Sequence, residues 1–79
     1  MPIQVLFFGS TAAITGQRQI EIDLANGSLA KDIFDQLLLS YPDLNAHRLL
    51  FSVNQQYATG DETVIDGDEL AIFTAVSGG

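Results

Sequence analysis

The last four residues, Val76-Ser77-Gly78-Gly79, have the types that could do chemistry. The two glycines leave bare backbone and one carboxylate, and four extended residues reach roughly 13 Å at about 3.3 Å per residue. A C-terminal carboxylate is inert until it is activated as an acyl phosphate or adenylate in another protein's nucleotide site. The absence of side chains would let the backbone enter such a site. Once adenylated, Gly79 could be attacked by a sulfur nucleophile and become a thiocarboxylate.

Two ordinary explanations of this tail stay open. Chain termini fray and tolerate small residues, and a recombinant protein can end on glycines left over from cloning. The residues that lead into the tail must decide between these alternatives.

The remaining polar residues do not form a recognisable catalytic or metal site. Five carboxylates cluster late in the chain, but they lack the spacing of a calcium loop, so we interpret them as a solvated turn: Asp61, Glu62, Asp66, Asp68 and Glu69. His47 is the single histidine and is predicted to be a surface residue, and cysteine is absent. We therefore predict no metal site, and a chain that is not an enzyme on its own.

Composition excludes several classes of partner. The chain has 79 residues, 47% of them hydrophobic, and a net charge of −7. This predicts one folded domain that repels nucleic acid and anionic membranes. The negative charge would attract a basic partner, and the alternative is that it serves only solubility. No apolar run approaches the roughly 20 residues that span a bilayer. The start Met1-Pro2-Ile3-Gln4 lacks the basic residues of a signal peptide, so we expect a cytoplasmic protein.

Hydrophobic periodicity predicts four strands and one main helix. Alternating apolar residues favour strands over residues 3–8, 19–24, 49–54 and 69–75, the second of them near a sheet edge. A stripe at spacings of three and four runs from Ala30 to Tyr41 and predicts an amphipathic helix that Ser28 caps and Pro42 ends. Leu39 lies off this stripe. Residues 10–16 are interpreted as a connector with about one helical turn, and residues 43–48 as irregular.

These elements predict an α+β fold with one face of its sheet open. The helix must bury its stripe against the sheet, so the other face would carry Leu6 and Phe8 from the first strand and Ala71 and Phe73 from the last. If those strands are neighbours, an apolar patch lies at the root of the tail, and such patches mark partner surfaces. The alternative is a surface with scattered apolar residues, which is ordinary.

Four segments of the sequence resemble one known family. The segments that carry the resemblance are, in order, Leu6-Phe7-Phe8, Val53-Asn54, the run from Asp66 to Phe73 (DGDELAIF) and the terminal Val76-Ser77-Gly78-Gly79. The chain resembles the MoaD-type branch of ubiquitin-like sulfur carriers, the small subunits of molybdopterin synthase. The resemblance implies a β-grasp fold, with a mixed sheet of four to five strands packed on one main helix and the first and last strands parallel and central. We expect a domain over residues 1–75 and a flexible tail over 76–79.

The resemblance also implies a role in molybdenum cofactor biosynthesis. A ubiquitin-activating-type enzyme would adenylate Gly79 behind Gly78, and a sulfurtransferase would supply the sulfur of the thiocarboxylate. That sulfur would pass to cyclic pyranopterin monophosphate in the large synthase subunit, within a heterotetramer. No cofactor is expected to bind the carrier, because the activating partner uses the ATP. The residues expected to contact partners are Leu6, Phe8, Ala71, Phe73, Val76 and Ser77.

Two alternatives and two departures accompany this resemblance. The chain could instead be a ThiS-like sulfur carrier for thiazole synthesis, or a non-catalytic ubiquitin-like interaction module. Thr74-Ala75 stand where the family commonly has two prolines, which predicts a looser tail that loses more conformational entropy on docking. The connector over residues 10–14 also lacks the arginine that the family often has there.

Overall fold

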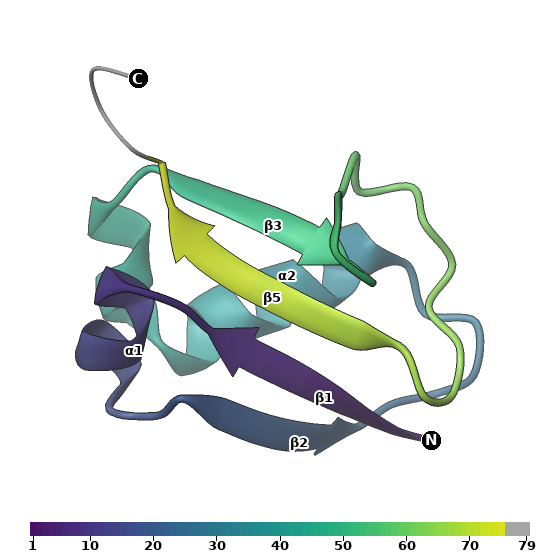
Figure 1. Cartoon of the computed structure of the whole chain (residues 1–79). Helices are drawn as coiled ribbons and strands as arrows, with labels where there is room; N and C mark the ends of the chain where they lie inside the picture. The colour runs from purple at the N-terminus through teal and green to yellow at the C-terminus, as the bar shows by residue number, and fades with distance from the viewer. Residues whose placement is uncertain (76–79) are drawn as a thin grey trace.

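The computed structural model of the chain describes residues 1–75, which form one five-stranded sheet in the order β2-β1-β5-β3-β4. Figure 1 shows the four longer strands side by side in the order β2-β1-β5-β3. Along the chain the elements are β1 (Pro2–Phe7), α1 (Ser10–Thr15), β2 (Gln19–Asp23), α2 (Ala30–Ser40), a 3₁₀ helix η1 (Pro42–Ala46), β3 (Leu49–Val53), β4 (Gln56–Tyr57) and β5 (Glu69–Thr74). The four predicted strands and the predicted helix are confirmed to within about one residue at each end.

The first and last long strands lie side by side in the centre of the sheet. β1 and β5 pair in parallel, with Val5 opposite Leu70 and Phe7 opposite Ile72. β2 and β3 add to this pair in antiparallel orientation on either side, and β4 completes the sheet beyond β3. A parallel pair needs a long crossover connection, and here nearly the whole chain supplies it. This arrangement confirms the β-grasp topology and places β2 at an edge, as its charged alternate residues predicted.

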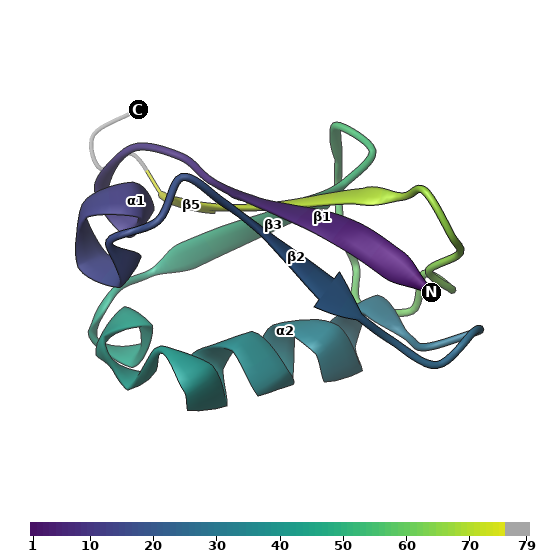
Figure 2. The same ribbon diagram turned by 90° about the horizontal axis from the view of Figure 1, so that it is seen from below.

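The core lies between α2 and one face of the sheet, and Figure 2 shows the helix beneath that face. The residues that the two central strands bury on this face are Ile3, Val5, Phe7, Leu70 and Ile72. From α2 they meet Ile33, Phe34 and Leu37, which come from the predicted apolar stripe. Each such side chain contributes about 1.5–3 kcal/mol when fully buried, so this face fixes where both strands lie.

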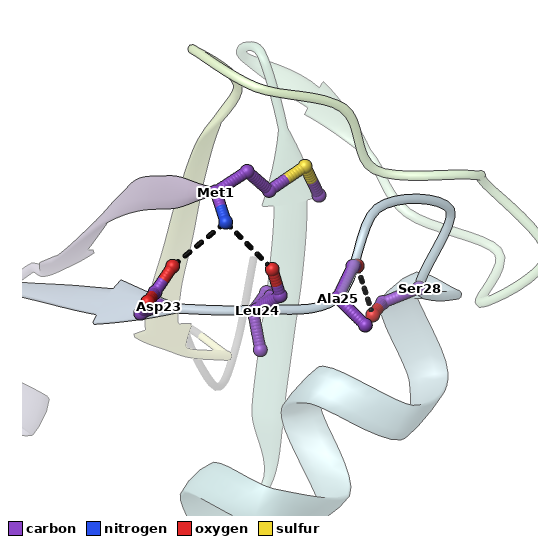
Figure 3. Close-up of polar contacts among 5 residues, drawn as sticks. All are labelled: Met1, Asp23, Leu24, Ala25 and Ser28. Atoms are coloured by element: carbon purple, nitrogen blue, oxygen red, sulfur yellow. Dashed lines mark hydrogen bonds and ion pairs between the residues drawn. The ribbon is translucent and has the colours of Figure 1, made fainter.

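The cap of α2 was predicted wrongly. Leu29, in extended conformation, is the N-cap, and no side chain bonds to the first turn. The hydroxyl of Ser28 instead donates to the carbonyl of Ala25 at 2.7 Å (Figure 3). The first N–H groups of the helix are satisfied by another segment, because Ala30 donates to the carbonyl of Glu62 at 2.9 Å and Lys31 to that of Gly60 at 3.0 Å. A tertiary contact therefore replaces the local cap.

The connectors are more regular than the sequence indicated. Residues 10–15 form a six-residue helix anchored by Thr11, which is fully buried, and the segment predicted to be irregular forms η1 around the buried Leu44. Leu39 points outward from α2 with 82% of its side chain exposed. No helix within residues 1–75 has the length and apolar character to cross a bilayer.

The N-terminus extends the β1–β2 ladder by one residue (Figure 3). The amino group of Met1 donates to the carboxylate of Asp23 and to the carbonyl of Leu24, both at 2.7 Å. The hydrogen bond from the amino group to the Asp23 carboxylate, together with the positive charge of the amino group, lowers the pKa of the Asp23 carboxyl. The start of β1 is thus fixed to the end of β2.

Candidate functional site

The open face of the sheet brings together the four apolar residues that the sequence placed there. Leu6 on β1 is opposite Ala71 on β5, and Phe73 on β5 is opposite Leu50 on β3. Phe8, directly after β1, is 51% exposed and lines the same surface depression as Phe73. Leu6 and Phe73 are half-buried, whereas Ala71 is only 5% exposed and forms the floor between them. No helix covers this face within the described part of the chain (Figure 2).

Tyr57 belongs to this face and was not anticipated as a site residue. It lies on β4 opposite Ser52, and its ring centroid is 6.0 Å from that of Phe73. Its side chain is 70% exposed. A two-residue strand is too short to show any periodicity, so the only available signal was an isolated aromatic residue in a polar segment. The hairpin pairs Tyr57 with Ser52 of β3, and Ser52 in turn lies opposite Ala71 of β5. The Tyr57 ring therefore reaches Phe73 across β3.

Between these aromatic residues lies a depression of about 380 Å³, which we call the open-face hollow. Its apolar walls are the rings of Tyr57 on β4, Phe73 on β5 and Phe8 directly after β1, and a carboxylate, an amide and a hydroxyl add polar groups. It is lined by Phe8, Ser52, Gln55, Tyr57, Glu69, Ala71 and Phe73. An apolar depression with a few polar groups is the usual form of a recognition site.

Hydrogen bonds fix the chain where it leaves β5. The buried hydroxyl of Thr11 lies 2.7 Å from the carbonyl oxygen of Phe8 and 2.8 Å from that of Ile72, so its proton ties the ends of β1 and β5 together. The hydroxyls of Ser10 and Thr74 are hydrogen-bonded at 2.9 Å, and the N–H of Ala75 donates to the carbonyl of Arg48 at 2.9 Å. A proline at residue 75 could not make this last bond.

Thr74 and Ala75 are therefore held by hydrogen bonds in place of the constraint that proline rings would supply. The other predicted site residues, Val76, Ser77, Gly78 and Gly79, lie outside the described residues. Whether the tail beyond Ala75 is looser stays a prediction.

The acidic cluster has structural roles. The carboxylate of Glu62 accepts hydrogen bonds from the backbone N–H groups of Thr59 at 2.7 Å and Gly60 at 2.9 Å, and these bonds, that of Thr59 first, lower the pKa of Glu62. Asp68 accepts from the N–H of Ile65 at 2.9 Å. Within residues 1–75 no three acidic or histidine side chains are grouped to hold a metal ion, and His47 is exposed after η1. The geometry of the described residues supports the docking of a partner protein on the open face of the sheet.

Comparison with known sequences places the chain among sulfur carriers. The family described as the ThiS family matches residues 5–79. The molybdopterin synthase sulfur carrier subunit of Chlamydomonas reinhardtii is 31% identical over 83 residues, covering 100% of both chains. The subunit of the same name from Mycobacterium tuberculosis is 34% identical over 80 residues, covering 98% of this chain and 96% of the relative.

Solved structures agree on the fold. SAMP1 of Haloferax volcanii superimposes with a TM-score of 0.84 at 26% identity, covering 100% of both chains. A chain of the complex of subunits 1 and 2 of the molybdopterin-converting factor of Helicobacter pylori superimposes with a TM-score of 0.70 at 22% identity, again over 100% of both chains. Because the family match spans residues 5–79 and the relatives align end to end, this ubiquitin-like β-grasp chain belongs to the ThiS family.

Proposed function

We propose that this chain is the sulfur carrier subunit of molybdopterin synthase. The observation that carries the proposal is the agreement of four relatives of this name, which are 30–34% identical to the chain over 98–100% of its length. The structure supports the proposal because the apolar open face lies beside the end of β5 at Thr74, from which the C-terminal residues follow. A carrier needs this combination, because it must dock on several enzymes and extend its C-terminus into each.

The chemistry follows from the terminal carboxylate. An activating enzyme of the ubiquitin-activating type would join the carboxylate of Gly79 to the adenylyl group of ATP and release pyrophosphate. A sulfur nucleophile, supplied through a sulfurtransferase, would then displace AMP and leave the thiocarboxylate. The carrier would deliver this sulfur to cyclic pyranopterin monophosphate. In this scheme the β-grasp domain binds no cofactor and contributes no general acid or base.

The large synthase subunit is the partner that we expect on the open face. The structurally similar chain from Helicobacter pylori was solved in a complex of subunits 1 and 2 of the molybdopterin-converting factor, which supports a two-subunit assembly. A heterotetramer is what the resemblance to the family implies. The contact would use Leu6, Phe8, Ala71 and Phe73 together with Tyr57. Val76 and Ser77 would follow the tail into the partner.

Two other functions have some support. The family name would suit a ThiS-like carrier for thiazole synthesis, and a similar solved chain from Haloferax volcanii is called a small archaeal modifier protein, which would suit a ubiquitin-like interaction module. The names of the four relatives favour a molybdopterin synthase subunit over both of these alternative functions.

The decisive experiment is the intact mass of the chain isolated from its native cell, followed by fragmentation of its C-terminus. Exchange of one oxygen for sulfur, localised to Gly79, is expected. Localisation is needed because oxidation of Met1 produces the same nominal mass gain. An ordinary carboxylate after incubation with ATP, activating enzyme and a sulfur source would contradict the carrier function. The variant Gly79→Ala should fold normally and slow pyrophosphate release.

A further inference from the structure

We propose that the open-face hollow receives an arginine side chain of the docking partner. The proposal rests on the proposed function only for the identity of that partner, since the chemistry of the hollow is a property of this chain alone. Three features of the hollow carry it: its aromatic walls, a carboxylate without a partner, and an amide held on strained backbone.

The walls suit a flat cation with an apolar stem. Tyr57 and Phe73 lie with ring centroids 6.0 Å apart and planes inclined at 42°, and Phe8 adds a third ring. A guanidinium group stacks on such ring faces and is attracted by their quadrupoles. The methylene groups behind it would pack on Ala71 at the floor of the hollow.

The carboxylate is that of Glu69, at the start of β5. Its backbone is fully used, since its N–H donates to the Asn54 side chain at 3.0 Å and its carbonyl accepts from the Asn54 N–H at 2.8 Å. Glu69 as a residue is half-buried, and among residues 1–75 its carboxylate has neither a hydrogen-bond donor nor a cation beside it. A guanidinium in the hollow would supply both. The net charge of −7 would also attract a basic partner surface to the chain as a whole.

The amide is that of Gln55, in the turn between β3 and β4. Both central residues of this turn have positive φ, 51° at Asn54 and 70° at Gln55, as a two-residue hairpin of type I′ requires. Asn54 tolerates this conformation well and uses its side chain to bond Asp68 at 3.0 Å. Glycine would occupy the second position without strain, yet Gln55 is there and lines the hollow. Residues held in sparsely populated backbone conformations cluster at functional sites, and the amide oxygen of Gln55 would be a second acceptor for the guanidinium N–H groups.

Lysine fits the same hollow less well. Its ammonium is a compact, strongly hydrated charge that does not stack on a ring while it pairs with a carboxylate, whereas the planar guanidinium does both. An uncharged polar side chain would leave Glu69 without its counter-ion. The three probes of the experiment below represent these three occupants.

The experiment titrates the full, nitrogen-15-labelled chain at constant ionic strength with the amides of N-acetyl-arginine, N-acetyl-lysine and the uncharged N-acetyl-citrulline. The arginine probe is expected to move the backbone signals of Tyr57, Glu69 and Phe73 along a saturating curve. Glu69→Gln should weaken this binding by roughly fivefold or more, and Asp35→Asn, an equal charge change on the exposed side of α2, by less than about twofold. Equal binding of the lysine or citrulline probe, or an unaltered curve for Glu69→Gln, would overturn the proposal.

Gln55→Gly separates recognition from folding. Relief of the backbone strain should raise the midpoint of thermal unfolding by roughly 3–6 °C, while loss of the amide weakens binding of the arginine probe. Stabilisation without any loss of binding would remove Gln55 from the site. None of these titrations requires sulfur chemistry, so a missing thiocarboxylate would contradict the proposed function alone, and a non-selective hollow would contradict this inference alone.

Discussion

The two faces of the sheet are built by the same strands and are used differently. Along β1, Ile3, Val5 and Phe7 point to α2, while Leu6 and the following Phe8 belong to the opposite face. The side chains on the covered face are buried in the core, whereas the open face leaves Phe8 exposed and Leu6 and Phe73 half-buried. Each Å² of apolar surface that stays exposed forgoes about 25 cal/mol of the stabilisation that its burial would contribute to folding. We infer that one face holds the fold and the other keeps its apolar surface available for partners.

The largest effect expected from this comparison is on the covered face. Ile72→Ala removes a fully buried side chain and should cost about 2–5 kcal/mol, a large share of the roughly 4–12 kcal/mol expected for a domain of this size. Leu39→Ala, at a side chain that is 82% exposed, should stay within about 0.5 kcal/mol. Urea unfolding measures both, and equal losses would break the distinction between covered and exposed positions.

On the open face the effect should appear in binding. Phe73→Asp is expected to keep the circular dichroism spectrum and to weaken association with the large synthase subunit by about a hundredfold, or roughly 2.7 kcal/mol. Leu39→Asp places the same charge on α2, away from the open face, and is the control. Titration calorimetry with the large subunit checks both variants. An unchanged affinity for Phe73→Asp would mean that this face is not the docking surface.

A third variant tests the hydrogen bonds by which Thr11 joins the ends of β1 and β5. Thr11→Val keeps the shape of a buried side chain but removes the hydroxyl that bonds the carbonyl oxygens of Phe8 and Ile72. The loss should be about 1–3 kcal/mol, measured by chemical unfolding. Thr11→Ser should restore much of it, and Thr63→Val, at an exposed position, should change little. A neutral Thr11→Val would show that the strand ends do not depend on this bond.

The smallest effect concerns pH and the loop that accepts the N–H groups of α2. The pKa of Glu62 is lowered from its ordinary value of 4.5 by hydrogen bonds that form only in the folded chain. A lowered folded pKa adds stability above about pH 4.5 and loses it as the pH falls through the folded value. Carbon-13 titration of the carboxyl should give a midpoint below 4.5, and Glu62→Gln should flatten the acid limb of the stability curve. A midpoint at or above 4.5 would contradict the loop geometry.

Much of this fold was predictable, and the failures share one cause. Period-two alternation located β1 and β5, and the apolar stripe with Pro42 located α2, because each pattern reflects burial on one face. The predicted cap at Ser28 failed because Ala30 and Lys31 donate to a loop some thirty residues away in the sequence. Tyr57 and Gln55 were missed for the same reason. Their role depends on which strands become neighbours, and local sequence does not encode this.

The parallel pairing of β1 with β5 also determines when during synthesis the sheet can form. The central ladder joins the two ends of the described chain, so its contacts are of high sequence separation, and such topologies fold more slowly than helical ones. The sheet cannot close during synthesis before β5 is made, because β5 completes its centre and follows the other four strands in the sequence. Under the proposed function, an unfolded chain would lack the open face on which partners are expected to dock, so folding would have to precede activation of the C-terminus.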